Sequence, residues 1–206
     1  MPLTTHPARQ RAPAMNPAER RQGIISATLP LLREYGANVT TSQIAHAAGV
    51  AEGTIFRVFE DKRELLQAAL CAAMSADAEV AKIGGVSATL PLMERLVQAL
   101  AAISDYQERL WSLMRALQDS GWRPDHDKFG DKDNHPRQQM RRIAGAMASL
   151  LEPDAAALRL SSRQAAGMLL ALAFTNRMQE HGLGEPPATP DQLVDLFLHG
   201  ALASHA

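Results

Sequence analysis

The chain has 206 residues and a formal net charge of −1, with 21 Lys and Arg against 22 Asp and Glu. This balance excludes a uniformly basic nucleic-acid-binding protein, so any affinity for DNA has to come from a local concentration of positive charge. The single cysteine, Cys71, excludes an internal disulfide and a multi-cysteine metal site, and it fits a reducing compartment.

The sequence also lacks the marks of a secreted or membrane protein. No apolar core follows the basic residues of the N-terminus, so no signal peptide is expected. No apolar run is long enough to span a bilayer. We therefore expect a cytoplasmic protein with no membrane partner.

The first 15 residues carry prolines, threonines and arginines without a helical period, which predicts no structure for this segment alone. Two interpretations remain open. The segment is either a solvated tail or a basic arm, containing Arg9 and Arg11, that settles on phosphates or in a minor groove when DNA is present.

The next residues predict the first helix. Asn16 is a good N-cap, Pro17 follows in the first turn, and Glu19 stands three residues after the cap. An apolar stripe then continues to Tyr35, and a glycine follows it. Pro30 lies inside this helix and removes one hydrogen bond, so we expect a kink or a tightened turn there.

Residues 40–66 predict two short helices around a glycine turn. Thr40 and Gln43 form a capping box at the start of the first of them. The first helix must end at Gly49, where the turn requires a left-handed backbone conformation that glycine adopts easily. The apolar Val50 is expected to fill the inside of the turn. This spacing is typical of a helix-turn-helix, whose second helix enters the DNA major groove, although an ordinary helical hairpin has similar features.

The residue order adds specificity to this pattern. Ile-Ala-x-x-Ala-Gly-Val at 44–50, Gly-Thr-Ile-Phe-Arg-x-Phe at 53–59 and Asp-Lys-x-x-Leu at 61–65 resemble the signature of the TetR family of bacterial repressors. The resemblance is specific over residues 20 to 70 or so. Beyond them it rests on helix number and length.

The resemblance implies a set of DNA-binding residues: Thr41, Ser42, Glu52, Gly53, Thr54, Phe56, Arg57 and Lys62. Thr41, Ser42 and Lys62 are expected at phosphates, and Thr54 at a thymine methyl group, a base edge or a phosphate. Arg57 is expected either to read guanine or bind phosphate, or to be a solvated residue tied to a carboxylate.

Three positions depart from the usual family pattern. Phe56 takes a place often held by tyrosine, so it keeps the apolar packing and loses a hydroxyl donor. Ala51 stands where many relatives have a serine cap, at a cost of about 1 kcal/mol. Glu52 suits the helix dipole but repels phosphate, so we expect it to accept from cytosine N4 or to turn away.

The remaining chain predicts helices separated by short breaks. One helix is expected from Asp61 to about Ala81, and we place the domain boundary at Gly84-Gly85. Further helices are expected at 87–103, from 104 to about 118, at 136–153, at 161–182 and from 189. The chain is thus predicted to be all-α with about nine helices, divided into an arm (1–15), a helix-turn-helix domain (16–83) and a ligand-binding and dimerisation domain (84–206).

The polar loop expected at 119–135 begins like a calcium-binding loop, with Asp125, Asp127 and a suitably placed Gly130. However, Phe129 occupies a ligand position, and Pro136 replaces the closing glutamate. We therefore expect a solvated loop with no metal and no cofactor. No catalytic constellation is apparent in the sequence, which predicts a protein that is not an enzyme.

The last two expected helices are apolar on most sides, and the resemblance implies that they form a homodimer. The expected interface residues are Leu169, Ala173, Leu193, Leu196, Phe197, Gly200 and Ala201. The alternative is that these helices only close the core of one protomer.

The resemblance also implies a ligand cavity in the C-terminal domain. The expected lining residues are Met93, Leu96, Trp111, Met114, Met140, Met147 and Phe174. Methionine adapts its shape readily, so this lining favours an apolar small-molecule effector. The alternative is that these residues are plain core.

Taken together, these features predict a homodimeric repressor that binds a palindromic double-stranded operator and is released by the effector. Two other functions remain open. One is a helical binding protein or enzyme for an apolar compound, and the other is an effector-independent structural protein associated with DNA.

Overall fold

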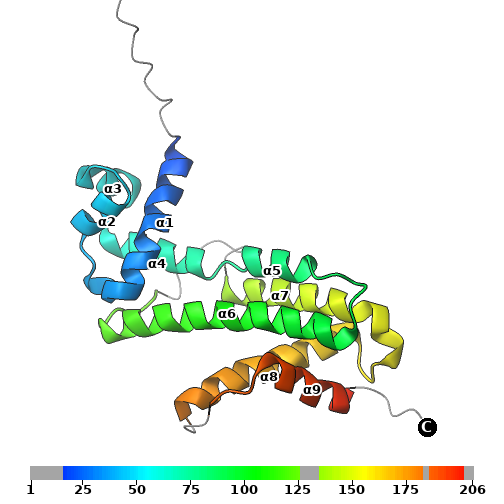
Figure 1. The fold of residues 1–206 in the computed structure, drawn as a ribbon. Helices are drawn as coiled ribbons and strands as arrows, with labels where there is room; N and C mark the ends of the chain where they lie inside the picture. The colour runs from blue at the N-terminus through cyan, green and yellow to red at the C-terminus, as the bar shows by residue number, and fades with distance from the viewer. Residues whose placement is uncertain (1–15, 126–134, 183–185, 202–206) are drawn as a thin grey trace, which may run out of the picture.

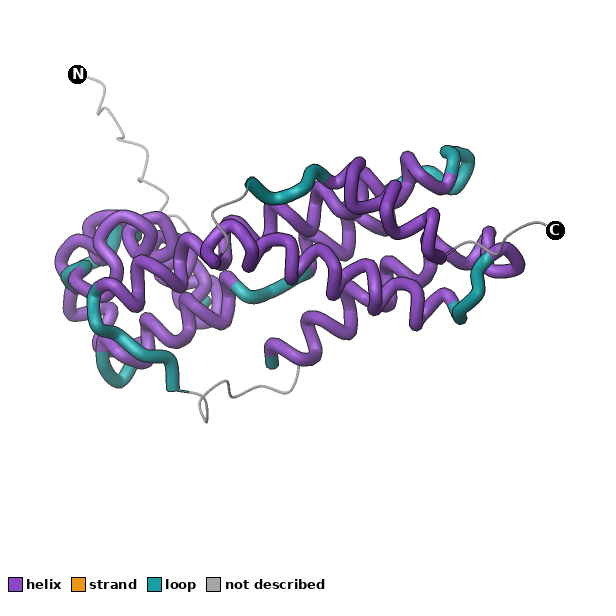
Figure 2. Tube along the Cα trace, turned by 90° about the horizontal axis from the view of Figure 1, so that it is seen from below, coloured by secondary structure: helices purple, strands orange, loops and turns teal. Residues whose placement is uncertain are grey.

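The computed structural model describes residues 16–125, 135–182 and 186–201, and these residues form helices and their connections with no strand (Figures 1 and 2). Two short 3₁₀ turns cover Gly36–Asn38 and Glu152–Ala157. The α-helices are α1 (Pro17–Tyr35), α2 (Thr41–Ala47), α3 (Glu52–Val58), α4 (Lys62–Ala73), α5 (Asp77–Gly84), α6 (Leu92–Asp119), α7 (Pro136–Leu151), α8 (Ser162–Gly182) and α9 (Pro190–Ala201).

The first helices begin where local capping chemistry predicts. The Asn16 side chain accepts a hydrogen bond from the Glu19 backbone N–H at 2.8 Å, and the Glu19 carboxylate accepts from the Asn16 N–H in return. Thr40 and Gln43 form the same reciprocal pair at the start of α2. Pro30 lies within α1 without ending it.

The helix predicted from Asp61 to Ala81 is in fact two helices. α4 ends at Ala73, and α5 begins at Asp77 after a three-residue break. No glycine or proline marks this break in the sequence. It is held by hydrogen bonds from α6 and α7, which a local pattern does not reveal.

The two helices predicted at 87–103 and 104–118 are one 28-residue helix, α6. Ser104 and Gln107, which resemble a capping pair in the sequence, lie in its interior. No glycine or proline interrupts residues 92–119, and the apolar stripe continues through Ile103 and Leu110. The predicted number of helices therefore agrees with the structure only because one split and one fusion cancel.

The buried side chains form two clusters, and α6 contributes to both. The larger cluster joins α5 to α9 around Leu100, Ile143 and Leu169. The smaller cluster joins α1 to α4, and its members include Leu113 and Leu117 from the C-terminal half of α6. Figure 1 shows α6 extending from the N-terminal helices below α4 and α5 to the other end of the molecule, with α8 and α9 on its opposite side. Along the chain, the change from the smaller to the larger cluster falls between Met74 and Ala76, and the domain boundary at Gly84-Gly85 stays a prediction.

The turn after α1 docks directly on the C-terminal end of α6. Gly36 is buried with a φ of 55°, and a Cβ atom placed there would lie 2.3 Å from the Ala116 carbonyl oxygen. The Ala37 backbone N–H donates to the Ser120 hydroxyl at 2.8 Å. This contact makes the end of α6 a rigid support for the N-terminal domain.

Candidate nucleic-acid interface

The two short helices α2 and α3 pack as the sequence predicts. Ile44 and Ala45 of α2 and Ile55 of α3 are buried on the inner side. Gly49 has a φ of 65°, the left-handed conformation expected for the turn. The Val50 backbone N–H donates to the Ala45 carbonyl at 3.0 Å and closes the turn. The outer face of α3 is consequently held at the surface.

That outer face presents most of the predicted reading residues. Glu52, Gly53, Phe56 and Arg57 are exposed, while Thr54 is half-buried. The Phe56 side chain is 53% exposed, although an aromatic ring usually packs inside. Arg57 forms no ion pair within the described part of the chain. The alternative that a nearby carboxylate holds Arg57 therefore gains no support.

A hydrogen bond from the Thr41 hydroxyl to the Glu52 carboxylate joins the first turns of α2 and α3. This contact occupies both groups, whereas the sequence predicts Thr41 at a phosphate and Glu52 near a base or turned away. It turns the Glu52 charge toward α2, because the carboxylate is held there. Ser42, the next predicted phosphate contact, is exposed.

Lys62, expected at a phosphate, makes a contact inside the protein. Its ammonium group donates to the Ala37 carbonyl oxygen at 2.6 Å, and the residue is half-buried. Lys62 thus ties the start of α4 to the turn that docks on α6. This bond uses one of the three N–H donors of the ammonium group, so two remain for a phosphate contact.

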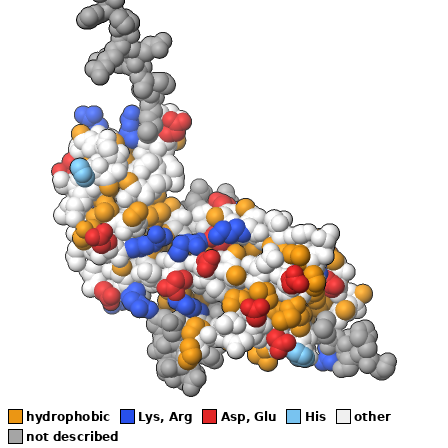
Figure 3. All heavy atoms as spheres, viewed as in Figure 1, with side chains coloured by type: hydrophobic (Ala, Val, Ile, Leu, Met, Phe, Trp, Pro, Cys, Tyr) orange, Lys and Arg blue, Asp and Glu red, His pale blue; other side chains and the backbone are white. Residues whose placement is uncertain are grey.

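Two patches of basic side chains, with an acidic one beside them, lie at the end of the molecule where α3 and the first turns of α1 lie, and a longer basic row crosses the middle of the same face (Figure 3). Arg21 of α1 stacks over the Phe59 ring at 4.7 Å and pairs with the Glu64 carboxylate at 3.3 Å. It therefore serves the packing of this domain. Arg9 and Arg11 of the predicted arm lie outside the described residues.

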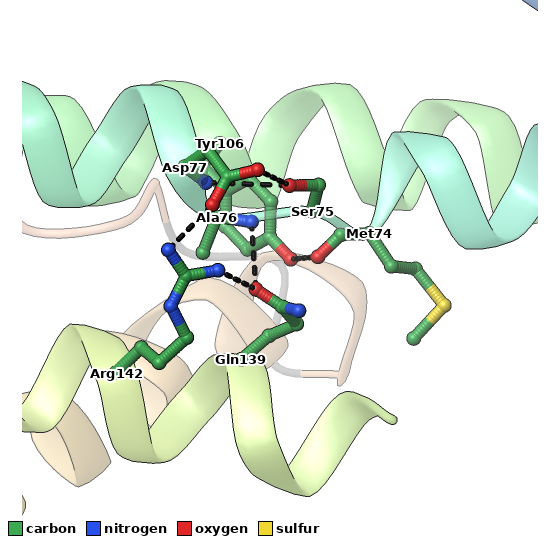
Figure 4. A network of polar contacts seen from close by, with 7 residues as sticks. All are labelled: Met74, Ser75, Ala76, Asp77, Tyr106, Gln139 and Arg142. Carbon is green, nitrogen blue, oxygen red and sulfur yellow. Dashed lines mark hydrogen bonds and ion pairs between the residues drawn. The ribbon is translucent and has the colours of Figure 1, made fainter. Parts of the chain in front are cut away.

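The break between α4 and α5 is clamped from two sides (Figure 4). From α6, the Tyr106 hydroxyl donates to the Met74 carbonyl oxygen at 2.7 Å. From α7, the Gln139 side-chain oxygen accepts from the Ala76 backbone N–H at 3.0 Å. The last turn of α4 is thereby fixed to the C-terminal domain.

Charge supports the same clamp. Arg142 of α7 pairs with Asp77 and donates to Gln139, and the Ser75 hydroxyl donates to Asp77 at 2.8 Å. The Ser75 hydrogen bond first, and then Arg142, lower the pKa of Asp77 below its usual value. Asp77 therefore stabilises the clamp at neutral pH, and this contribution is lost as the pH falls through its lowered pKa.

Tyr106 keeps its proton throughout the useful pH range. Burial, with a smaller effect of the Glu79 carboxylate, raises the pKa of Tyr106 to about 12. Glu79 is itself buried and paired with Arg109. Because the hydroxyl stays protonated, its hydrogen bond to Met74 is insensitive to pH near neutrality.

A cavity of about 390 Å³ lies between α6, α7 and α8. Its wall contains Ile103, Tyr106, Gln107, Leu110, Trp111, Met114, Gln118, Met140, Ile143, Leu170 and Phe174. The Trp111 and Phe174 rings are tilted by 36° to each other, with centroids 6.3 Å apart. Leu110 packs against both buried clusters, so the cavity lies where the two cores meet.

Four of the seven predicted ligand residues line this cavity: Trp111, Met114, Met140 and Phe174. The other three are not in its wall. Leu96 and Met147 are fully buried in the C-terminal core, and Met93 is exposed on the first turn of α6. Sequence reasoning missed Tyr106 and Gln107, because a search for apolar stripes passes over polar residues that border a cavity.

The predicted dimer residues divide between two faces. Leu169, Ala173, Leu193 and Phe197 are buried in the core of the protomer, whereas the Leu196 side chain is 63% exposed. Gly200 and Ala201 end α9, and their surroundings lie outside the described residues. The prediction thus combined buried and exposed positions of α8 and α9, because an interface and a core have the same apolar spacing.

The outer face of α8 and α9 carries a second apolar surface. A shallow hollow of about 440 Å³ is lined by Leu160, Met168, Ala171, Leu172, Thr175, Leu196 and Phe197. Met168 and Met178 of α8 are both half exposed. Exposed apolar patches of this kind mark interaction surfaces.

Within the described residues, no cluster of three or more His, Cys, Asp or Glu is arranged to hold a metal ion. Most of the calcium-like segment lies outside these residues, including Asp127 and Gly130. No described helix is long and apolar enough to cross a membrane.

Comparison with known proteins identifies the helix-turn-helix. The family model of bacterial regulatory proteins of the tetR family matches residues 24–69. The HTH-type transcriptional regulator BetI of Cronobacter sakazakii is 46% identical over 57 residues, which are 27% of this chain and 28% of BetI. The match thus spans little more than a quarter of that relative.

Solved structures match over most of the chain. A TetR-family regulator of Mesorhizobium loti has a TM-score of 0.68 at 17% identity, covering 91% of this chain and 99% of its own. One from Streptomyces coelicolor has a TM-score of 0.59 at 21% identity, covering 88% and 80%. A complex of SmeT with triclosan has a TM-score of 0.54 at 21% identity, covering 90% and 92%. These similarities show the shared fold, with an N-terminal helix-turn-helix and a C-terminal helical domain.

Proposed function

We propose that this chain, a DNA-binding transcriptional regulator of the TetR family, is a repressor that binds a palindromic operator as a homodimer and is released by a small apolar effector. The family and its regulatory role rest on the matched helix-turn-helix. The repressor role, the operator symmetry and the effector are our proposals.

The proposal that this protein binds DNA rests on the exposed face of α3. It combines an exposed aromatic ring, Phe56, an exposed Arg57 and the open backbone of Gly53. None of these three is explained by packing within the described structure. Each suits a surface that approaches DNA, where Phe56 contacts the sugar-phosphate wall and Arg57 reaches guanine or phosphate.

A single α3 contacts too few base pairs for tight and specific binding to DNA. A twofold symmetric dimer places two such helices in successive major grooves, about 34–36 Å apart. We assign the interface to the outer face of α8 and α9, around Met168 and Leu196, because these are apolar side chains left uncovered in the protomer. The proposed interface keeps Leu196 from the set that the sequence suggested and adds Met168.

The cavity between α6, α7 and α8 is the proposed effector site. Its volume and its mainly apolar wall suit a small organic ligand. The similar SmeT structure, a complex with triclosan, supports ligand binding by this fold.

The position of the cavity suggests how an effector releases DNA. Tyr106 forms part of the cavity wall and also holds the end of α4 through Met74. A ligand that prefers a different position of Tyr106 shifts α4, and with it the spacing of the two reading helices. A hundredfold loss of operator affinity requires about 2.7 kcal/mol of such coupling.

Gly53→Ala tests the placement of α3 against DNA. Alanine is expected to raise the free energy of unfolding by up to about 0.5–1 kcal/mol, because a Cβ atom there meets nothing within 4 Å and glycine is a poor helix former. Operator affinity should nevertheless fall about tenfold or more, since the new methyl group separates the α3 backbone from DNA. Chemical denaturation and fluorescence anisotropy with labelled operator measure the two effects.

Gly145→Ala is the matched control, because it also lies in a helix with open space at its Cβ position. It should gain similar stability and keep full operator affinity. Wild-type affinity in the Gly53 variant would remove the start of α3 from the DNA interface.

Tyr106→Phe tests the clamp on α4. Loss of one buried hydrogen bond, about 1 kcal/mol, is expected to speed amide exchange around residues 74–77 several-fold. Operator affinity should fall by a similar factor, and neither difference should change between pH 6 and 9, because the pKa of Tyr106 is about 12. Tyr35→Phe, at an exposed tyrosine, is the control. Unchanged exchange at residues 74–77 would exclude Tyr106 as the clamp.

A further inference from the structure

The wall of the cavity between α6, α7 and α8 bears no side chain that is charged near neutral pH, among the residues described. Its titratable group, the Tyr106 phenol, has a pKa of about 12 and remains neutral. A charged ligand would therefore leave water without gaining an opposite charge in the wall, which is strongly unfavourable.

Gln107 is a buried polar residue of the cavity wall. It is only 8% exposed, it lines the cavity, and it forms no hydrogen bond with any described residue. The other two buried glutamines of the described chain are both paired. Gln67 exchanges two hydrogen bonds with the backbone of Asp125, and Gln139 accepts from the Ala76 N–H.

Neither polar atom of the Gln107 amide is among the fully buried atoms that lack a partner, although the residue as a whole is buried. The amide therefore reaches the open space of the cavity that the residue lines. In a helix interior such as α6, an apolar residue would serve packing better at this position. An amide that opens into an apolar cavity is the arrangement that fixes ligand orientation and gives specificity.

We propose that Gln107 is the polar recognition residue of the cavity, and that its ligand is a neutral, mainly apolar and aromatic molecule carrying one hydroxyl or carbonyl group. The apolar part of the ligand lies against Trp111 and Phe174, and its polar group pairs with the Gln107 amide. This inference rests on the proposed effector site and adds the chemical class of the ligand.

Three probes of one ring system separate the contributions: naphthalene, 2-naphthol and 2-naphthoate. Calorimetric titration of the full chain without DNA is expected to rank 2-naphthol about tenfold tighter than naphthalene. Naphthalene covers the Gln107 amide and leaves it unpaired, whereas the hydroxyl pairs with it. The anionic 2-naphthoate should bind most weakly at pH 7.5.

Gln107→Met keeps the length of the side chain and removes the amide. In this variant the preference should disappear or reverse, with naphthalene gaining several-fold and 2-naphthol losing a similar factor. Gln118→Met is the matched control, because Gln118 also lines the cavity but is exposed at its rim. It should keep the wild-type ranking. Gln107→Leu provides a second apolar variant if the methionine protein folds poorly.

Equal binding of naphthalene and 2-naphthol by the wild-type protein, tightest binding of 2-naphthoate, or no binding of any probe would overturn the proposal. A ranking that survives in both Gln107 variants would also overturn it. The titrations contain no DNA, so their result does not depend on whether the ligand releases the protein from its operator. If the Gln107 preference holds but 2-naphthol leaves operator binding unchanged, the ligand class is supported and the release by effector fails.

Discussion

Gly36→Ala is expected to lower the free energy of unfolding by about 3–5 kcal/mol. Two costs combine at this position. The φ of 55° with a ψ of −143° belongs to a region that is open almost only to glycine, at about 1–3 kcal/mol for other residues. The new Cβ atom would also lie 2.3 Å from the Ala116 backbone oxygen, and overpacking adds about 1–3 kcal/mol.

The effect should concentrate at the contact between the two domains. The turn after α1 must move away from α6, so the hydrogen bond from Ala37 to Ser120 is expected to break. Urea denaturation measures the stability, and amide exchange at Ala37 reports the local opening. Gly145→Ala again serves as the control, with stability equal to or above wild type. A Gly36 variant as stable as wild type would contradict the packing of this turn.

Leu196→Asp is expected to convert the dimer to monomers and to lower operator affinity by about 100-fold or more. The substitution places a charge in the centre of the apolar surface on α8 and α9 without disturbing the core, because Leu196 is 63% exposed. Loss of the partner removes the second reading helix and its effective concentration at the adjacent half-site. Sedimentation equilibrium and operator titration measure the two effects.

Met93→Glu is the control for Leu196→Asp. It introduces a charge at another exposed apolar side chain, on the first turn of α6. It should leave the sedimenting mass and the operator affinity unchanged. A dimer that persists in the Leu196 variant would place the interface elsewhere on the protomer.

The helices of the N-terminal domain could be predicted from the sequence because short-range interactions determine where they begin and end. The caps at Asn16 and Thr40 and the left-handed Gly49 act within a few residues, so their outcome depends little on the rest of the fold. The exposed outer face of α3 followed from the positions of Ile55 and Phe59, which are both buried.

The errors lie where distant residues decide the outcome. The break after Ala73 depends on Tyr106 and Gln139, which are 32 and 63 residues further along the chain than their partners Met74 and Ala76. The prediction split α6 in two because Ser104 suited a cap locally, whereas the packing of a continuous apolar stripe favours one longer helix. In both places tertiary contacts outweighed the local signal.

The site residues show the same limit. Lys62 carries the expected residue type, but only the folded chain shows its hydrogen bond to Ala37. Leu169 and Leu196 are equally apolar, and the sequence did not separate the buried one from the exposed one. Gln107 gives no signal in a periodic pattern, because its role depends on a cavity formed by three helices.

The most direct test of the central claim is selection of bound sequences from a random pool of double-stranded DNA at near-physiological salt. The proposed function predicts enrichment of a pseudo-palindrome whose half-sites lie about one helical turn, or a small multiple of it, apart. The Leu196→Asp protein should enrich a single half-site weakly or none. Enrichment of a non-palindromic sequence, or no enrichment by the wild-type protein, would contradict a symmetric dimer that reads DNA through α3.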